Sequence, residues 1–248
     1  MEFDLSKINF SNNDLKRNIC IPKKLTPKLA EFIGIVVGDG HIGYYKYVKN
    51  NRSRTNYELR ISGNVKDSDY YLTHVNNLAY ELFNMRFYKI NPKNEESVML
   101  YKNSKAIYYF FSECLKIPQR KDTISIPSCI LEAPNDVKSS FLRGLADADF
   151  TLTIKKKEGK PYPFIQGVSK SKILINQVSL ILKEWGINHT TFLDKYFYEK
   201  RNISYEVKRI NINGVNNIKG WFNKIGFSNT RHRKTWEEFL KKSAPVRI

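Results

Sequence analysis

The feature that most constrains this chain is a stripe of small residues that ends in an aspartate and occurs twice. Each stripe has a four-residue spacing, and its members are Ala30, Gly34 and Gly38 before Asp39, and Ser140, Gly144 and Ala148 before Asp149. Each member of the second stripe lies 110 residues after its counterpart. Small residues at this spacing form a flat strip on one helix face, which lets two backbones approach closely. The chain is therefore predicted to contain one unit twice, with the two stripe-bearing helices (the motif helices) packed on each other.

The same offset holds further along the chain. Apolar positions of the first copy have apolar counterparts in the second, namely Phe111, Leu115 and Ile117 against Trp221, Ile225 and Phe227. We place the boundary so that residues 1–130 form the first unit with an N-terminal arm and residues 131–248 form the second.

Both copies show the same order of predicted elements. Thr26 followed by Pro27 predicts a helix start, with a capping hydroxyl and a proline at the first helical position. Alternating apolar residues at Tyr57, Leu59 and Ile61 predict a half-buried strand, paired with residues 42–49 as a hairpin. A second helix, two further strands and a last helix complete each copy, and a change of phase over 204–213 predicts a bulge. The fold class is therefore α+β, with two pseudo-symmetric αββαββα units that each hold a four-stranded antiparallel sheet.

Charge narrows the range of partners. Lys and Arg number 42 against 24 Asp and Glu, which gives a formal net charge of +18. This excess indicates a polyanionic partner, with nucleic acid ahead of an anionic membrane. A hydrophobic share of 41% is too high for a disordered chain and too low for a membrane bundle. No apolar run is long enough for a membrane span, so no membrane association is expected.

The cysteines indicate the compartment. Cys20, Cys114 and Cys129 are odd in number and far apart, so they form neither a disulfide framework nor a C-x-x-C zinc pair. The start of the sequence lacks a basic segment followed by an apolar stretch, so no export signal is expected. The expected location is the cytoplasm, associated with the nucleoid, or the matrix of an organelle.

The two aspartates are the candidate metal ligands. If the motif helices pack together, Asp39 and Asp149 lie at helix ends where the macrodipole is negative and a carboxylate is disfavoured. Such a pair requires a compensating cation, and Mg²⁺ binds one or two carboxylates together with substrate phosphate. An aspartate beside a glycine is also an ordinary turn residue. The duplication and the net charge favour a metal site for phosphodiester hydrolysis over two independent turns.

These residues carry a family resemblance. The runs FIGIVVGDG (32–40) and LRGLADADF (142–150) resemble the two motifs of the LAGLIDADG homing endonucleases, and the flanking runs IPKKLTPKLAEF and SGNVKDSDYY are similar to the single-chain, two-motif, archaeal-type members. The resemblance implies that the motif helices form the interface between the halves and that Asp39 and Asp149 are the catalytic, metal-binding acids. Phe150 stands where the family usually has glycine, which predicts an altered turn after Asp149.

The family also uses basic residues near each metal site. Lys66 and Lys170 match that position in the two copies and are the further catalytic candidates, and Lys102 is a weaker one. A solvated surface charge is the competing interpretation of each lysine.

Two sheets of this kind would form a saddle on duplex DNA, with outward side chains facing the major groove. An eight-residue strand spans roughly 26 Å, which covers about eight base pairs. The candidate DNA contacts are the outward positions Tyr45, Tyr47, Arg60, Thr151, Thr153, Lys155 and Gln166.

The predicted function is that of a monomeric homing endonuclease that hydrolyses both strands of a long DNA site with Mg²⁺, held by one aspartate from each half, in the service of intron or intein mobility. Two alternatives stay open. One is an RNA-splicing maturase that binds intron RNA, and the other is a DNA-binding regulator of the same fold without catalysis.

Overall fold

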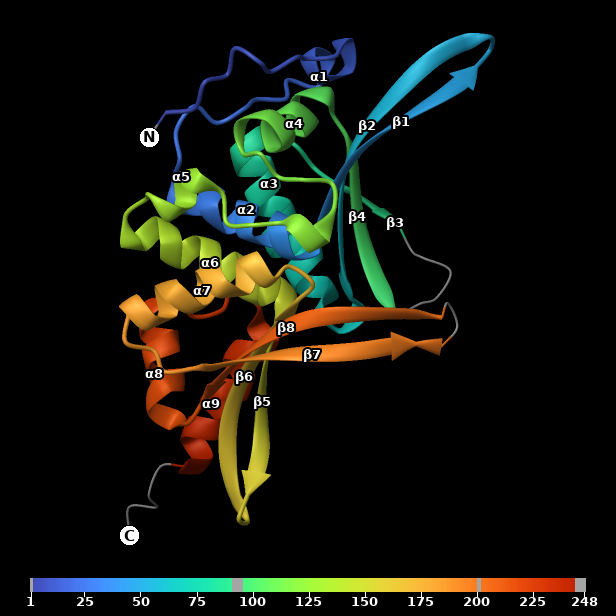
Figure 1. Ribbon diagram of the computed structural model, residues 1–248. Coiled ribbons are helices and arrows are strands. Elements are labelled where there is room, and N and C mark those ends of the chain that lie inside the picture. The colour runs from blue at the N-terminus through green and yellow to red at the C-terminus, as the bar shows by residue number, and fades with distance from the viewer. Residues whose placement is uncertain (1, 91–95, 200–201, 244–248) are drawn as a thin grey trace. The chain divides into compact units, whose positions relative to one another are not determined.

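The computed structural model describes residues 2–90, 96–199 and 202–243 (Figure 1). The chain divides into two compact units. Unit 1 comprises residues 1–120 and 126–148, and unit 2 comprises residues 121–125 and 149–248. These units differ from the two sequence copies, because the motif helix that opens the second copy belongs to unit 1.

Unit 1 contains a four-stranded antiparallel sheet in the order β1-β2-β4-β3. Its strands are β1 (Gly40–Lys49), β2 (Arg52–Asn64), β3 (Tyr88–Ile90) and β4 (Ser97–Asn103). Its helical elements are α1 (Asn12–Lys16), α2 (Pro27–Asp39), η1 (Val65–Asp67), η2 (Tyr70–Val75), α3 (Asn76–Phe83), α4 (Lys105–Tyr109), η3 (Phe110–Cys114), α5 (Ser128–Leu131) and α6 (Asn135–Asp149). The last residue of α6, Asp149, falls in unit 2.

Unit 2 repeats the sheet in the order β5-β6-β8-β7, again antiparallel. Its strands are β5 (Phe150–Lys157), β6 (Lys160–Ser169), β7 (Thr190–Tyr198) and β8 (Ile203–Asn213). Its helical elements are η4 (Lys121–Thr123), α7 (Lys172–Glu184), α8 (Val215–Lys224) and α9 (Thr230–Ser243). The predicted α+β class with a four-stranded antiparallel sheet in each half is confirmed.

The motif helix α2 begins and ends where the sequence predicts. The Thr26 hydroxyl accepts a hydrogen bond from the backbone N–H of Leu29 at 3.2 Å, and Pro27 occupies the first turn, where its missing N–H costs nothing. Residues 29–37 are all buried. The helix ends at Asp39, and β1 starts at the next residue. The chain therefore passes from the aspartate directly into the sheet.

The predicted bulge in residues 204–213 is wrong. The pairing of β8 with β6 and with β7 runs without interruption, from Phe164 opposite Asn213 to Tyr198 opposite Ile203. The phase change arises because both faces of this inner strand are covered in part. Ile210 and Ile212 are buried on one face, and Val207 is buried on the other.

Two glycines bring α2 and α6 into backbone contact within unit 1. A Cβ built on Gly34 would lie 2.1 Å from the carbonyl oxygen of Phe141, and one built on Gly144 would lie 2.0 Å from the carbonyl oxygen of Glu31. Both distances are far inside van der Waals contact. No residue larger than glycine fits either position while the helices keep this separation.

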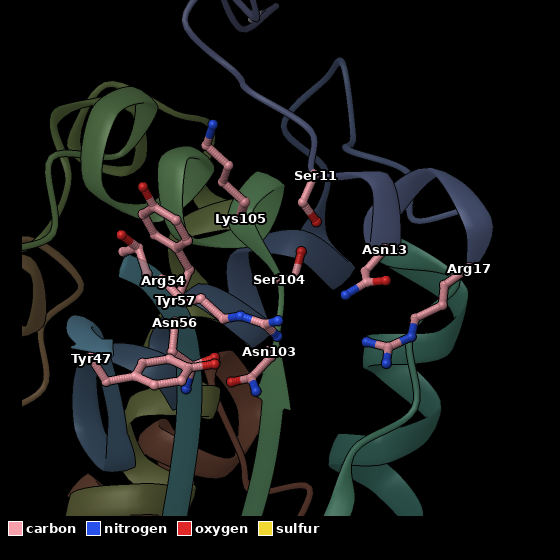
Figure 2. Close-up of a pocket in the computed structure, with 11 residues that line it drawn as sticks. Ser11, Asn13, Arg17, Tyr47, Arg54, Asn56, Tyr57, Asn103, Ser104 and Lys105 are labelled. Carbon is pink, nitrogen blue, oxygen red and sulfur yellow. The ribbon is translucent and has the colours of Figure 1, made fainter. Parts of the chain in front are cut away.

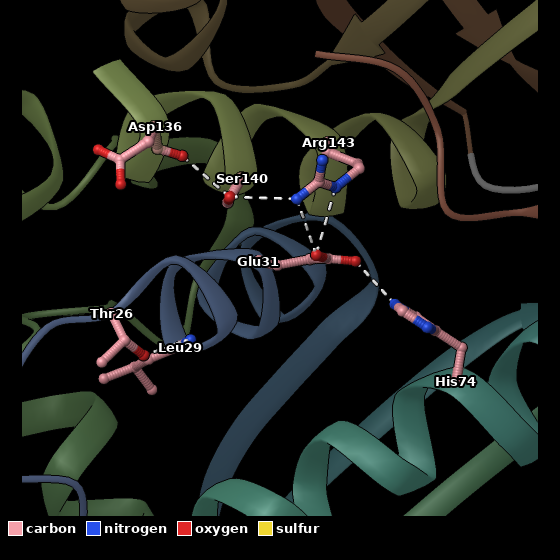
Figure 3. A network of polar contacts seen from close by, with 7 residues as sticks. All are labelled: Thr26, Leu29, Glu31, His74, Asp136, Ser140 and Arg143. Atoms are coloured by element: carbon pink, nitrogen blue, oxygen red, sulfur yellow. Dashed lines mark hydrogen bonds and ion pairs between the residues drawn. The ribbon is translucent and has the colours of Figure 1, made fainter. Parts of the chain in front are cut away.

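An ion pair joins the same two helices beside the glycines (Figure 3). Glu31 of α2 is 6% exposed, and its carboxylate accepts hydrogen bonds from Arg143 of α6 at 3.2 Å and from His74 of η2 at 2.7 Å. Arg143 also donates to the Ser140 hydroxyl at 3.1 Å. A buried carboxylate is stable only with such partners. The contact thus fixes the rotation of α6 on α2 as well as their separation.

The substitution of Phe150 for glycine is matched by a second change across the sheet. In β1 the first residue is Gly40, and it pairs with Ile61 of β2. In β5 the first residue is Phe150, and it pairs with Gly167 of β6. A Cβ on Gly167 would lie 2.3 Å from the Phe150 ring, which packs on Trp221 with ring centroids 5.8 Å apart. The altered turn predicted after Asp149 is absent, because the ring occupies the space that Gly167 leaves.

Replacing Gly34 by Ala should lower the free energy of unfolding by about 1–3 kcal/mol, because the new methyl group forces the helix backbones apart. Urea denaturation of purified protein measures the change. The matched control is Gly220→Ala in α8, where the added Cβ would lie 3.7 Å from Ile187, an ordinary contact. That control should gain about 0.5–1 kcal/mol from helix propensity. Equal stabilities of the two variants would contradict the packing described for α2 and α6.

Candidate metal site and nucleic-acid interface

Asp39, the last residue of α2, is held by a tyrosine. The Tyr71 hydroxyl donates a hydrogen bond to Oδ2 of the carboxylate. Tyr71 is 2% exposed. Its ring lies against Gly63 of β2, where any Cβ would collide with it at 2.1 Å. The glycine in β2 therefore makes room for the ring that orients the carboxylate.

Burial raises the pKa of Tyr71 well above its ordinary value, and the negative charge of Asp39 raises that pKa further. Burial also raises the pKa of the neighbouring Tyr70, and among the nearby charges that of Asp147 raises it most. Both phenols therefore stay protonated over the accessible pH range. Tyr71 is a permanent hydrogen-bond donor to Asp39.

Asp149 ends α6 and lies in unit 2. Burial raises the pKa of this carboxyl group to about 6, and Lys121 opposes the rise. The helix end adds a partial negative charge, because the last carbonyl groups of a helix point toward it. Asp149 is thus a carboxylate in a poorly solvated place, where a bound cation would offset the cost of its charge.

The two carboxylates suit a cation that brings its own additional ligands. Among residues 2–90, 96–199 and 202–243, no group of three or more His, Cys, Asp and Glu side chains is placed to hold a metal ion. An all-protein cage of the kind that structural zinc requires is therefore not formed in this part of the chain. Mg²⁺ retains several waters and is commonly held by one or two carboxylates and substrate phosphate. Asp39 and Asp149 are each a carboxylate of the kind that such a ligand set uses.

The candidate lysines lie where strands lead into helices. Lys66 is exposed in η1, and its backbone N–H donates to the Asn64 side chain at 2.9 Å. Lys170 is exposed between β6 and α7, with Nζ 4.9 Å from the centre of the Tyr205 ring. Each lysine follows the strand that pairs with the start of β1 or β5, and so lies at the end of the sheet where the aspartate of its half is found.

Lys102 points away from the exposed sheet face. It lies on the same side of β4 as Val98 and Leu100, is 6% exposed, and donates to the carbonyl oxygen of Arg86 at 3.0 Å. Burial lowers its pKa, and the charge of Arg17 lowers it further. This lysine is a structural residue of unit 1.

The outward face of the unit 1 sheet carries the predicted contact residues of that half. Tyr45, Tyr47 and Arg60 lie on one side of the β1–β2 hairpin, opposite the side that holds the buried Ile42 and Leu59. Arg60 donates to the Tyr45 hydroxyl at 3.1 Å and pairs with Glu58. The face therefore presents a guanidinium held beside the phenol ring of Tyr45.

The outward face of the unit 2 sheet is also as predicted. Thr151, Thr153 and Lys155 alternate with the buried Leu152 along β5, and Gln166 lies opposite Thr151 on β6. The Gln166 amide donates to the Asn211 side chain at 3.0 Å. Both outward faces therefore present polar and basic side chains, as a surface that reads DNA requires.

Sequence reasoning missed the residues that support this site. Tyr71, Glu31 and Arg143 lie within the runs that carry the family resemblance, but those runs do not indicate their roles, which depend on contacts between segments distant in the sequence. The aromatic face of β7 and β8 was also missed. Phe192, Tyr196, Tyr198 and Tyr205 are exposed there, on the same side as Gln166. The placement of Phe192, Tyr196 and Tyr198 at even-numbered positions along β7 was the available signal.

Comparison with known proteins identifies the architecture. Residues 136–226 match the family model of the LAGLIDADG-like domain. The crystal structure of I-DmoI in complex with DNA and Mn has a TM-score of 0.56 to this chain, with 23% sequence identity over 82% of this chain and 98% of that one. The I-LtrWI LAGLIDADG homing endonuclease bound to target DNA has a TM-score of 0.55, with 11% identity over 87% of this chain and 89% of that one.

Curated relatives share the sequence within much longer proteins. A probable translation initiation factor IF-2 from Methanocaldococcus jannaschii is 24% identical over 229 residues, which cover 91% of this chain and 17% of that protein. A tRNA-splicing ligase RtcB from Methanopyrus kandleri is 26% identical over 227 residues, which cover 83% of this chain and 21% of that protein. The chain thus spans about a sixth of the first relative and about a fifth of the second.

The fold and the duplicated motif helices define a two-motif α+β protein. The resemblance to the LAGLIDADG homing endonucleases is confirmed: residues 136–226 match the model of a LAGLIDADG-like domain, and the chain has the fold seen in solved structures of those enzymes. In the part of the chain that the structure describes, no helix combines the length and apolar character that crossing a membrane requires.

Replacing Tyr71 by Phe removes the hydroxyl that orients Asp39. We expect the free energy of unfolding to fall by about 1.5–3 kcal/mol, the range for a hydrogen bond to a charged group. A double-mutant cycle with Asp39→Asn, measured by urea denaturation, should give a coupling energy of at least about 0.5 kcal/mol. Tyr45→Phe on the exposed face is the control and should change stability by no more than about 0.5 kcal/mol. Additive effects of the two changes would show that the hydroxyl does not hold the carboxylate.

Proposed function

We propose that this chain is a site-specific DNA endonuclease that hydrolyses both strands of a long duplex target. The observation that carries the proposal is the repeated construction in which a motif helix ends in an aspartate and passes directly into a sheet with a polar, basic outward face. That arrangement occurs at Asp39 and again at Asp149. The resemblance in fold to structures bound to DNA supports the same substrate.

The carboxylates of Asp39 and Asp149 are proposed as ligands of Mg²⁺, one from each half. The ion, when bound, would supply a water of lowered pKa and neutralise charge on the scissile phosphate. Tyr71 holds the Asp39 carboxylate in one orientation. Lys66 and Lys170 are proposed to stabilise the charge that develops on the phosphate, and the outward strand residues to position the duplex.

The chain is proposed to act as a monomer in the cytoplasm, at the nucleoid, or in an organellar matrix, because both halves of the duplicated unit are present in one chain. A role in intron or intein mobility is proposed from the relatives. Similar segments occupy small fractions of proteins whose names denote unrelated activities, a translation factor and an RNA ligase. A coding segment that moves between genes would produce this distribution.

An RNA-splicing maturase is the second candidate, and a specific observation favours it. The exposed rings of β7 and β8 include Tyr196 and Tyr205, which stack with centroids 5.7 Å apart, and Phe192 beneath the Arg209 guanidinium. Exposed aromatic side chains on a sheet are the usual means of stacking unpaired bases. Tighter binding to a structured intron RNA than to any duplex DNA would favour this candidate over the nuclease.

Replacing Asp39 or Asp149 by Asn should abolish cleavage while leaving DNA binding nearly intact, because the carboxylates serve the chemistry and the basic strands supply affinity. A library of duplexes incubated with the protein and Mg²⁺, followed by sequencing of the ends, first identifies the target. Cleavage and binding are then measured on that duplex. Wild-type cleavage by either variant would refute the catalytic assignment, and a wild type that binds a duplex without cutting it would identify a regulator.

Affinity for duplex DNA should fall steeply with salt, because binding through Lys and Arg releases counterions from the phosphates. Each neutralised phosphate contributes about 0.9 to the slope of log affinity against log salt concentration. Fluorescence anisotropy with a labelled duplex at several KCl concentrations measures this slope. A slope near zero would exclude nucleic acid as the partner of this surface.

A further inference from the structure

A polar cleft of about 600 Å³ lies in unit 1 beside the β1–β2 hairpin (Figure 2). One wall is the N-terminal arm, with Ser11, Asn13 and Arg17 in or beside α1. The facing wall is the outer part of the hairpin, with Tyr47 and Arg54 among its residues. The end of β4 and the start of α4 form the remainder of the lining. The volume is in the range of ligand-binding clefts.

The wall formed by α1 is fixed in place. Asp14 is 1% exposed, and one of its carboxylate oxygens accepts hydrogen bonds from the backbone N–H groups of Lys105 at 3.1 Å and Ala106 at 3.2 Å. The same oxygen accepts the N–H of Ser11 at 2.9 Å. A single buried carboxylate therefore ties α1 to the start of α4. The cleft is formed before any ligand arrives.

The facing wall is the part of β2 that extends past the four-stranded sheet. Pairing of β2 with β4 begins at Glu58, so residues 52–57 have a strand neighbour only on the β1 side within the described sheet. The Asn56 amide donates to the Tyr101 hydroxyl at 3.1 Å, and that hydroxyl donates to Asn103. This chain of polar side chains fixes the floor of the cleft.

The cleft carries positive charge and no lining carboxylate. Its charged lining residues are Arg17, Arg54 and Lys105. Arg17 and Arg54 are exposed and form no ion pair within residues 2–90, 96–199 and 202–243. Arg17 also contributes to the lowered pKa of the buried Lys102 nearby. The charge of the cleft is thus unbalanced and suits an anionic ligand.

We propose that this cleft binds the sugar–phosphate backbone of duplex DNA at the outer end of the half-site that the unit 1 sheet reads. The proposal rests on the nuclease function proposed above. Tyr47 lies eight residues beyond Asp39 along the chain, on the same outward face as Tyr45 and Arg60. That length of strand spans roughly 26 Å, or about eight base pairs. The cleft should therefore contact phosphates about eight base pairs from the cut, on the side bound by unit 1.

The test uses the full chain and the duplex recovered by library cleavage. The duplex is prepared in a long form and in two shortened forms, each cut back on one side to about six base pairs from the cleavage position. Arg17→Ala and Arg54→Ala should each bind the long duplex more weakly and lower its salt slope by about 0.9. Neither change should affect binding to the form that lacks the unit 1 flank. Lys16→Ala, which removes an exposed charge from α1 outside the cleft, is the matched control and should leave both affinities and the slope unchanged.

Ethylation interference locates the contact. In wild type, modified phosphates about eight base pairs from the cut on one side should block binding, and in Arg17→Ala that interference should disappear. Wild-type affinity, slope and interference in both arginine variants would overturn the cleft proposal and leave the nuclease proposal intact, provided that wild type still cuts the duplex. A wild-type protein that neither binds nor cuts any duplex would overturn both.

Discussion

The backbone contact between α2 and α6 is the constraint on which the candidate site depends. Gly34 and Gly144 allow a separation that no side chain would permit. The buried Glu31 and its partner Arg143 then fix how the helices are rotated. Since α2 runs without a break into Asp39 and β1, a shift of this helix would move that carboxylate and the strand that follows it. The small-residue stripe of α2 therefore helps to set the positions of Asp39 and β1, which follow it in the chain.

Burial acts on a different group at each of the two aspartates. At Asp39 a buried phenol with a raised pKa supplies a fixed hydrogen-bond donor that orients the carboxylate. At Asp149 burial acts on the carboxyl group itself and raises its pKa to about 6. The excess basic side chains instead lie on exposed strands and loops, where water solvates their charge. Those exposed charges are available to a polyanion.

Much of the fold could be predicted from the sequence, because the relevant signals are local. A capping threonine, the period of two in the strands and the duplicated stripe are each contained in a short window. The supporting residues could not be predicted in this way. Tyr71 acts on Asp39, and Asp14 on α4, through contacts that only the folded chain creates. The bulge predicted in β8 was wrong for a related reason, since side chains buried on both faces of an inner strand imitate a change of phase.

The exchange of glycine across the first strand pair has a consequence for how the two halves can diverge. Phe150 and Gly167 are complementary in size across the strand pair, whereas Gly40, which pairs with Ile61, leaves room for Val36 of α2. Recombination that transfers only the first residue between halves would create either a void or a collision. Transfer of the whole hairpin would carry both members together. The two members of the pair in unit 2 therefore have to change together, which limits how the two halves can diverge at this layer.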